Sequence, residues 1–247
     1  MAAFLMLALI ALIVGFFCGC TSIGGILLIP AIVLLSSLDI HQAMATALFS
    51  FALMSVLGTW LHHRKGSINW KQAVPMCCGA MLCGYVGAKA NTLFSPDWLR
   101  VILAGLILFA GLSTLRSAPN IRFDVTGRPM RTQCLILFAL GAFVGFMAGL
   151  TGVGGPVLSV PFMIGMGFSP LYSIAIGQPL QVVAGASGSV ANILSGSIDY
   201  VMATWVTLLE LFGFYMGIIA AYRMKSQWLR KIISCLCILT SLYLFIR

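Results

Sequence analysis

The chain has 247 residues, of which 61% are hydrophobic and 8% are charged. A soluble domain carries about 25% charged residues. The composition therefore excludes a water-soluble protein and predicts an all-α polytopic membrane protein, because long apolar runs cross a bilayer as helices. The net charge of +9 favours basic cytoplasmic loops over nucleic-acid binding, since membrane proteins gather Lys and Arg on that side.

Residue patterns that support metal binding or catalysis are missing from the sequence. The eight cysteines form no C-x-x-C pair, so neither a metal nor another cofactor is expected. Most of them are interpreted as small apolar packing residues. Cys18 and Cys20 stand apart because a Gly-Gly follows them closely. The chain also contains neither H-E-x-x-H nor G-x-S-x-G, which argues against an enzyme.

Ten apolar segments follow one another along the chain. Most reach the roughly 20 residues that a helix needs to cross a bilayer. Two shorter segments, 25–37 and 156–168, begin at or just after a Gly-Gly. They are interpreted as half-helices or as the returning arms of hairpins. Whether they cross the whole membrane stays open. In order, the segments are 3–20, 25–37, 43–61, 72–91, 99–115, 134–150, 156–168, 172–195, 200–221 and 229–246.

The segments form two blocks of five that match at one constant offset along the chain. We therefore predict an N-terminal membrane repeat (1–115), a cytoplasmic linker (116–133) and a C-terminal membrane repeat (134–247). Because five is odd, the second repeat is expected upside down, an arrangement typical of secondary transporters. Identical pairs at this offset include Gly15/Gly145, Gly19/Gly149, Thr21/Thr151, Gly24/Gly154 and Gly25/Gly155.

The basic residues test this inverted arrangement of 5 + 5 segments. Eleven of the 14 Lys and Arg residues lie in the loops 62–71, 116–133 and 222–231. These loops are predicted to be cytoplasmic, with both termini outside the inner (plasma) membrane of a bacterium. The counterpart of 62–71, at 192–201, keeps the Gly-Ser-Ile turn but has no base. Such a difference is expected if the same turn lies on opposite faces of the membrane.

The duplicated Gly-Gly motifs are the candidate binding site. A Gly-Gly breaks a helix, and the half-helices that follow, from Ile26 and Pro156, present an N-terminus that attracts anions. We expect a central anion site between the two breaks, with added hydroxyl and amide donors. Its candidate substrate-binding residues are Cys20, Thr21, Ser22, Gly24, Gly25, Thr151, Gly152, Gly154, Gly155, Gln178 and Gln181.

Other interpretations of these residues stay open. Gly15, Gly19, Gly145 and Gly149 are better explained by close helix packing, and the two glutamines could serve interhelical hydrogen bonds instead. Glu210, an acid deep within a segment, is a candidate for carrying a coupling proton or for pairing with a buried donor. The Cys18 thiol is a further candidate for the site.

The double T-x-x-G-G…P signature resembles the TauE/SafE family of membrane transporters. The resemblance covers the full length and rests on residues 19–25 with Pro30 and on residues 149–155 with Pro161. It implies export of sulfite, sulfoacetate or another organosulfonate or carboxylate. A small anion and the lipid bilayer are thus the expected partners, and a homodimer is compatible with the sequence but not required by it.

Two other functions compete with an anion carrier. A thiol–disulfide carrier would use Cys18 and Cys20, but their counterparts in the second repeat are Ala148 and Leu150. An anion channel would need the same pore chemistry as a carrier, and the sequence does not separate the two.

Overall fold

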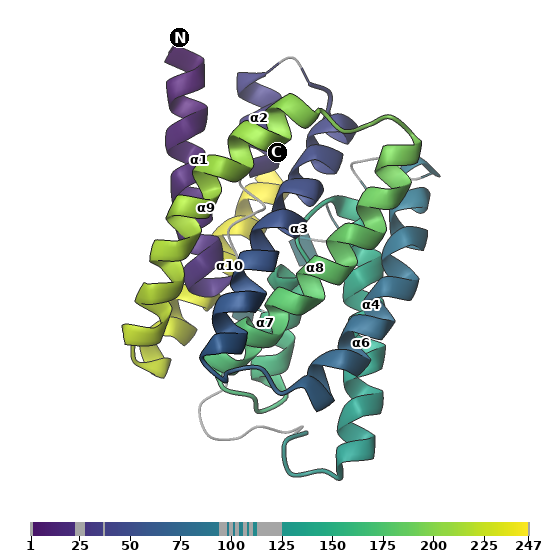
Figure 1. Cartoon of the computed structure of the whole chain (residues 1–247), viewed down its shortest axis with the longest axis vertical. Helices are drawn as coiled ribbons and strands as arrows, with labels where there is room; N and C mark the ends of the chain where they lie inside the picture. The colour runs from purple at the N-terminus through teal and green to yellow at the C-terminus, as the bar shows by residue number, and fades with distance from the viewer. Residues whose placement is uncertain are drawn as a thin grey trace.

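The computed structural model describes residues 2–22, 28–36, 38–93 and 125–246, together with 98, 101, 104–105, 108 and 111–112. The described part is a bundle of helices without strands (Figure 1), which confirms the all-α class. Its elements are α1 (Ala2–Thr21), α2 (Leu28–Leu35), α3 (Ile40–Arg64), α4 (Trp70–Ala90), the short 3-10 helix η2 (Asn91–Leu93), α6 (Met130–Thr151), α7 (Pro156–Gly165), α8 (Pro170–Leu194), α9 (Tyr200–Arg223) and α10 (Ser226–Ile246).

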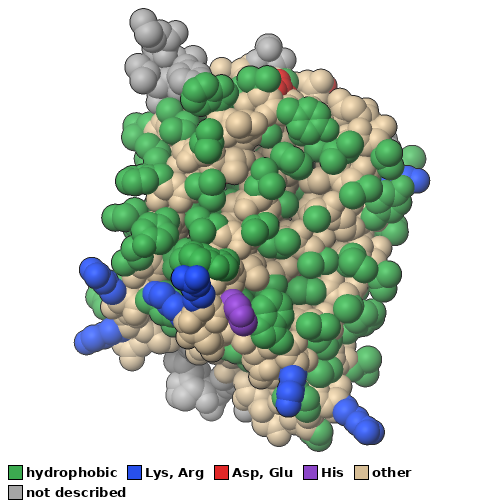
Figure 2. All heavy atoms as spheres, in the orientation of Figure 1, with side chains coloured by type: hydrophobic (Ala, Val, Ile, Leu, Met, Phe, Trp, Pro, Cys, Tyr) green, Lys and Arg blue, Asp and Glu red, His purple; other side chains and the backbone are tan. Residues whose placement is uncertain are grey.

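The described helices have the length and composition of a multi-pass membrane protein. Four of them, α3, α4, α6 and α9, are long and apolar enough to cross a bilayer. Most of the expected segment 99–115 and most of the linker lie outside the described residues. On the face shown in Figure 2, most Lys and Arg side chains gather at the lower end, below a broad apolar surface. Exposed bases at helix ends include Arg64, Lys71, Arg223 and Lys225.

Polar N-caps fix where the long helices begin. Asp39 caps α3 in a capping box with Gln42, and Ser169, at the matching position of the second repeat, caps α8. Asn69 and Asp199, which also match each other between the repeats, cap α4 and α9. The caps and the bounds of α3 and α8 therefore recur with the spacing of the sequence repeat.

Glycine-mediated contacts join α1 to α9 and α4 to α6, and these are the most extensive helix contacts in the described part. A Cβ at Gly19 would overlap the carbonyl oxygen of Phe214, and one at Gly149 would overlap that of Gly84. These contacts confirm the packing interpretation of the glycines. The partners Gly84 and Phe214 themselves occupy matching positions in the two repeats, so the contact recurs in both halves.

Helices α3 and α8 lie at the centre of the bundle. They pack on each other, α3 also contacts α9, and α8 also contacts α4. In Figure 1, α1 descends from the N-terminus at the top, whereas α6 rises from the lower end. How the bundle is oriented in a membrane stays a prediction.

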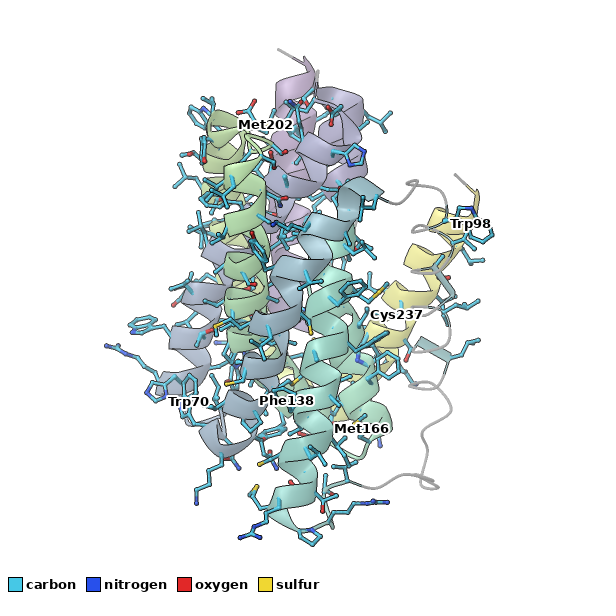
Figure 3. All side chains as sticks on the ribbon, turned by 90° about the vertical axis from the view of Figure 1, so that its right-hand side faces the viewer. Trp70, Trp98, Phe138, Met166, Met202 and Cys237 are labelled. Atoms are coloured by element: carbon cyan, nitrogen blue, oxygen red, sulfur yellow. The ribbon has the colours of Figure 1, made fainter. Side chains whose placement is uncertain are left out.

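The second Gly-Gly motif forms a hairpin. Helix α6 ends at Thr151, the chain turns, and α7 runs back for 10 residues, about 15 Å. The backbone N–H of Val125, just before α6, donates to the carbonyl oxygen of Met166, just after α7 (3.0 Å). The start of α6 and the end of α7 therefore lie at the same end of the bundle, where Figure 3 also places Met166. Helix α7 is a returning arm and is too short to cross a membrane by itself.

Candidate functional site

A small buried cavity lies about halfway along the bundle. Phe51 and Gln181, which both line it, are near the middle of the 25-residue helices α3 and α8. Its volume of about 20 Å³ is room for about one water molecule. Residues from five parts of the chain form its wall, namely Cys18, Ser22, Phe51, Met54, Ser55, Gly154, Pro156, Val157, Gln178, Gln181 and Phe214.

Residues from both repeats reach this cavity, close to the positions where α1 and α6 end. Ser22 comes directly after α1, and Gly154 lies between α6 and α7. Gln178 and Gln181, one turn apart on α8, connect the two breaks. The sequence-predicted residues Ser22, Gly154, Gln178 and Gln181, with Cys18, are thus brought together.

The N-terminus of α7 is partly satisfied within the protein. Pro156, at the first turn as expected, has no N–H, and the N–H groups of Val157 and Leu158 bond back to the carbonyls of Gly154 and Gly155. The N–H of Gly155 donates to Oε1 of Gln181 (2.6 Å). The described residues supply no acceptor to the N–H of Gly154, which leaves a buried donor beside the cavity.

The two glutamine side chains are almost fully buried but only half paired. Gln178 is 1% exposed and Gln181 is 2% exposed. Nε2 of Gln178 donates to Oγ of Ser22 (2.7 Å), whereas its Oε1 has no partner in the described part of the chain. Nε2 of Gln181 is also without a partner there. Because an unpaired buried amide costs about 1–3 kcal/mol, these atoms favour a water molecule or a ligand at the cavity.

Ser22 occupies a backbone conformation that favours glycine. Its φ is +60°, and among the described residues it alone has a positive φ without being glycine. At the matching position of the second repeat, Gly152 has a φ of +66°. Both residues donate their N–H to the carbonyl four residues earlier, Cys18 and Ala148 respectively. The strained serine keeps a hydroxyl within reach of Gln178.

Some expected ligands are occupied elsewhere or lie outside the described residues. Oγ1 of Thr21 donates to the carbonyl of Phe17 (2.8 Å), and Oγ1 of Thr151 donates to that of Met147 (2.7 Å). These hydroxyls stabilise helix ends and do not line the cavity, and neither does Gly152. The expected sites at Gly24 and Gly25 fall outside the described residues.

The cysteines do not form a redox pair at the cavity. Cys18 lines it, but Cys20 points to a different contact, with its Sγ 3.9 Å from Sδ of Met224. None of the eight cysteines, all of which lie within the described residues, forms a disulfide. A thiol–disulfide carrier needs two thiols within reach of each other, and this conformation does not bring them together.

Comparison with known proteins identifies the family. The family model described as "Sulfite exporter TauE/SafE" matches residues 7–244. The chain belongs to this family. No solved structure matches it.

Relatives of this TauE/SafE chain are similar over most of their length. "Probable membrane transporter protein YdhB" of Bacillus subtilis is 24% identical, over 86% of this chain and 88% of the relative. "Probable membrane transporter protein MJ0441" of Methanocaldococcus jannaschii is 23% identical, over 98% and 97%. "Probable membrane transporter protein ORF9" of a Sinorhizobium species is 27% identical, over 99% and 91%. Family membership and these names indicate a membrane transporter, not an enzyme.

Glu210 of this family member is fully buried on α9. Oγ of Ser50, on α3, donates to its Oε2 (2.6 Å), and Oγ1 of Thr207 lies 2.8 Å from Oγ of Ser50. Its Oε1 has no partner among the described residues. Glu210 does not line the cavity, but Phe214, one turn further on, does.

The sequence did not predict the contribution of α3. Phe51, Met54 and Ser55 line the cavity, and Ser50 holds the acid. Ser50 and Ser55 could have been singled out from the sequence, because polar residues inside an apolar segment are unusual. Phe51 carried another, since it matches Gln181 when the two repeats are aligned.

Proposed function

We propose that this chain is a secondary transporter that exports a small anion, such as sulfite, sulfoacetate or another organosulfonate or carboxylate. The observation that supports the proposal is the convergence of Ser22, directly after α1, and Gly154, in the second Gly-Gly motif, on one buried cavity with unpaired amide groups. Ser22 and Gly154 come from the two halves, and Gln178 and Gln181 connect them. Binding sites between broken helices at mid-depth are typical of secondary transporters.

The chemistry of the cavity favours an anion held by neutral donors. Among the described residues, its lining has no Lys, Arg, Asp or Glu, and it contains the unpartnered Nε2 of Gln181 beside the start of α7. The partial positive charge of a helix N-terminus adds to these N–H groups.

The transported anion requires the cavity to expand. A volume of about 20 Å³ does not hold a sulfite ion or a sulfonate. We therefore assign this conformation to an occluded state, and the breaks at residues 22 and 152–155 are the places where α1–α2 and α6–α7 can move. Movement of one repeat against the other around a fixed site is the general mechanism of such folds.

The membrane arrangement is part of the same proposal. The repeats 1–115 and 134–247 would be inverted, and the linker 116–133 would be cytoplasmic together with the loops 62–71 and 222–231. This follows from the gathering of bases at one end (Figure 2) and from the positive-inside rule. Both termini would then lie outside the inner membrane of a bacterium.

Glu210 is the proposed carrier of a coupling proton. An acid within a membrane bundle is costly when charged and has no basic partner among the described residues. Oε1 is free to hold a proton, while Ser50 holds Oε2. Phe214, one turn from Glu210 on α9, lines the cavity. Protonation of the acid and binding of the anion in the cavity can therefore influence each other.

The proposal is tested by removing the unpartnered amide. Gln181→Leu should lower anion flux into proteoliposomes about tenfold or more, because it removes two hydrogen-bonding atoms from the site. Gln227→Leu, at an exposed position on α10, is the matched control and should transport normally. Sulfite, sulfoacetate and a simple carboxylate would be compared. Normal flux in the Gln181 variant, with unchanged thermal stability, would exclude the site.

The same vesicles distinguish a carrier from a channel. A carrier gives flux that saturates and shows counterflow, since the anion on one side exchanges with the anion on the other. An ohmic current without counterflow would instead establish the channel alternative.

A further inference from the structure

An apolar groove runs along the outer surface of the bundle between α3, α4 and α8. Its volume is about 540 Å³. Side chains along it are exposed, including Val56 (53%), Val74 (51%) and Met81 (55%). It is lined by Val56, Thr59, Trp60, His63, Trp70, Val74, Cys77, Cys78, Met81, Pro179, Val182 and Val183. In a membrane protein such a surface faces lipid.

The groove extends along the bundle for about the thickness of one lipid leaflet. From Trp70, the first residue of α4, to Met81 the helix rises about 16 Å. One leaflet of the hydrocarbon core is about 15 Å thick. Figure 3 shows Trp70 at the lower end of the bundle, the same end as Met166 and the end opposite Met202. The groove thus begins at the basic end and stops near mid-depth.

The mouth of the groove is built from aromatic rings and a cation. Nε1 of Trp70 donates to Nδ1 of His63 (3.1 Å), which fixes one side of the opening. Cζ of Arg64 lies 4.2 Å from the ring centroid of Trp60, which also lines the groove. No ion pair to Arg64 occurs within the described residues, and the loop 62–71 contains no acid. Tryptophans lie typically at the headgroup level of a bilayer.

We propose that this groove binds one acyl chain of an anionic phospholipid, with the lipid phosphate at the Arg64 guanidinium. The apolar wall matches the chain, and a guanidinium without an ion pair at the headgroup level matches a lipid headgroup with net negative charge. A zwitterionic lipid offers the same chain but no net charge. If a second copy of this chain covered the groove instead of a lipid, the Arg64 guanidinium would be left without a negatively charged partner.

The bound chain would lie against the turn of α8 that carries the site amides. Pro179, Val182 and Val183 face the groove, whereas Gln178 and Gln181, in the same turns, line the central cavity. The lipid proposal itself does not depend on which anion is transported.

Fluorescence quenching by brominated lipids tests the proposal. Trp98, Trp205 and Trp228 are replaced by Phe, so that Trp60 and Trp70 report alone. The protein is placed in phosphatidylcholine vesicles containing about 10 mol% brominated lipid, so that this lipid competes with an excess of the zwitterionic one. Brominated phosphatidylglycerol should quench more strongly than the same fraction of brominated phosphatidylcholine. Equal quenching by both lipids would overturn the proposal.

Two variants and one control locate the binding site. Arg64→Gln should lower the relative affinity for phosphatidylglycerol about fivefold, the value of one base near an anionic surface. Cys78→Phe, which fills the groove but keeps Arg64, should also lower the relative affinity for phosphatidylglycerol. Lys225→Gln, which removes another exposed base, should leave this affinity unchanged. If Arg64→Gln and Lys225→Gln behave alike, the attraction is only that of the general surface charge, and the proposal fails. Absence of quenching by either lipid would mean that a second copy covers the groove, which also overturns it.

Discussion

Ser22 shows how one residue can combine strain with a polar contact. Its left-handed backbone costs about 1–2 kcal/mol relative to glycine, as at Gly152 in the second repeat. Ser22→Gly should therefore keep or raise stability, whereas Ser22→Ala should be less stable than Ser22→Gly by about 1 kcal/mol. Thermal unfolding in detergent measures the order.

Both Ser22 variants lose the acceptor of the Gln178 amide. Transport should fall in both by a similar factor, although their stabilities differ. Normal transport by Ser22→Gly would show that the hydroxyl does not support the site. If Ser22→Ala were the more stable variant, the left-handed conformation would be wrong.

Glu210→Gln separates a coupling role from a structural one. The amide copies the shape of a protonated acid and can still accept the hydrogen bond of Ser50. We expect counterflow of the anion to continue, because it needs no net proton movement. Uptake driven by a pH gradient should be lost, since the amide cannot release a proton.

The two assays use the same proteoliposomes, and Gln227→Leu, at its exposed position on α10, again serves as the variant control. Gradient-driven uptake that persists in Glu210→Gln would assign the acid a structural role. Loss of both activities would show that the bond to Ser50 needs the carboxylate itself.

At the scale of the helix, close packing depends on single glycines. Gly19→Ala would place a methyl group on the Phe214 carbonyl, and the α1–α9 contact would have to separate. The cost should be about 1–3 kcal/mol, as for other overpacked interiors. Gly165→Ala on α7 is the matched control, because nothing lies within 4 Å of its added methyl group. Gly19→Ala should therefore melt at a lower temperature in detergent than Gly165→Ala. Equal melting temperatures would contradict the contact between α1 and α9.

The elements were largely predictable because length and hydrophobicity determine where a helix can cross a membrane. The segments 43–61 and 172–195 became α3 and α8, extended by the caps at Asp39 and Ser169. The hairpin arm after Gly155 was also expected, since Gly-Gly followed by proline breaks and restarts a helix.

The site was only partly predictable for a physical reason. In a membrane helix, an apolar residue facing a cavity and one facing lipid look alike, so Phe51 and Phe214 gave no periodic signal. The two threonines illustrate a different physical effect. Thr21 and Thr151 bond to their own helices, as short hydroxyl side chains often do, and so their donors are not available to a ligand in this conformation.

For the whole molecule, the proposed inverted orientation of the two repeats is the property on which alternating access would depend. The turns after α3 and α8 have the same local structure, with Gly66 at a φ of +65° and Gly196 at +67°. Lys65 and Ser195 precede these glycines at matching positions, and both are exposed. They differ in charge, which the positive-inside rule explains only if they lie on opposite sides of the membrane.

Cysteine labelling at this matched pair measures the orientation. In a background without the eight native cysteines, Ser195→Cys should react with a membrane-impermeant maleimide added outside intact cells. Lys65→Cys should react only after the membrane is permeabilised, although it is exposed in the same kind of turn. Because both positions have equivalent backbone surroundings, a difference in reactivity reports the side of the membrane and not the structure of the turn. Reaction of both from the outside would rule out the inverted repeat and, with it, the access mechanism proposed for the central cavity.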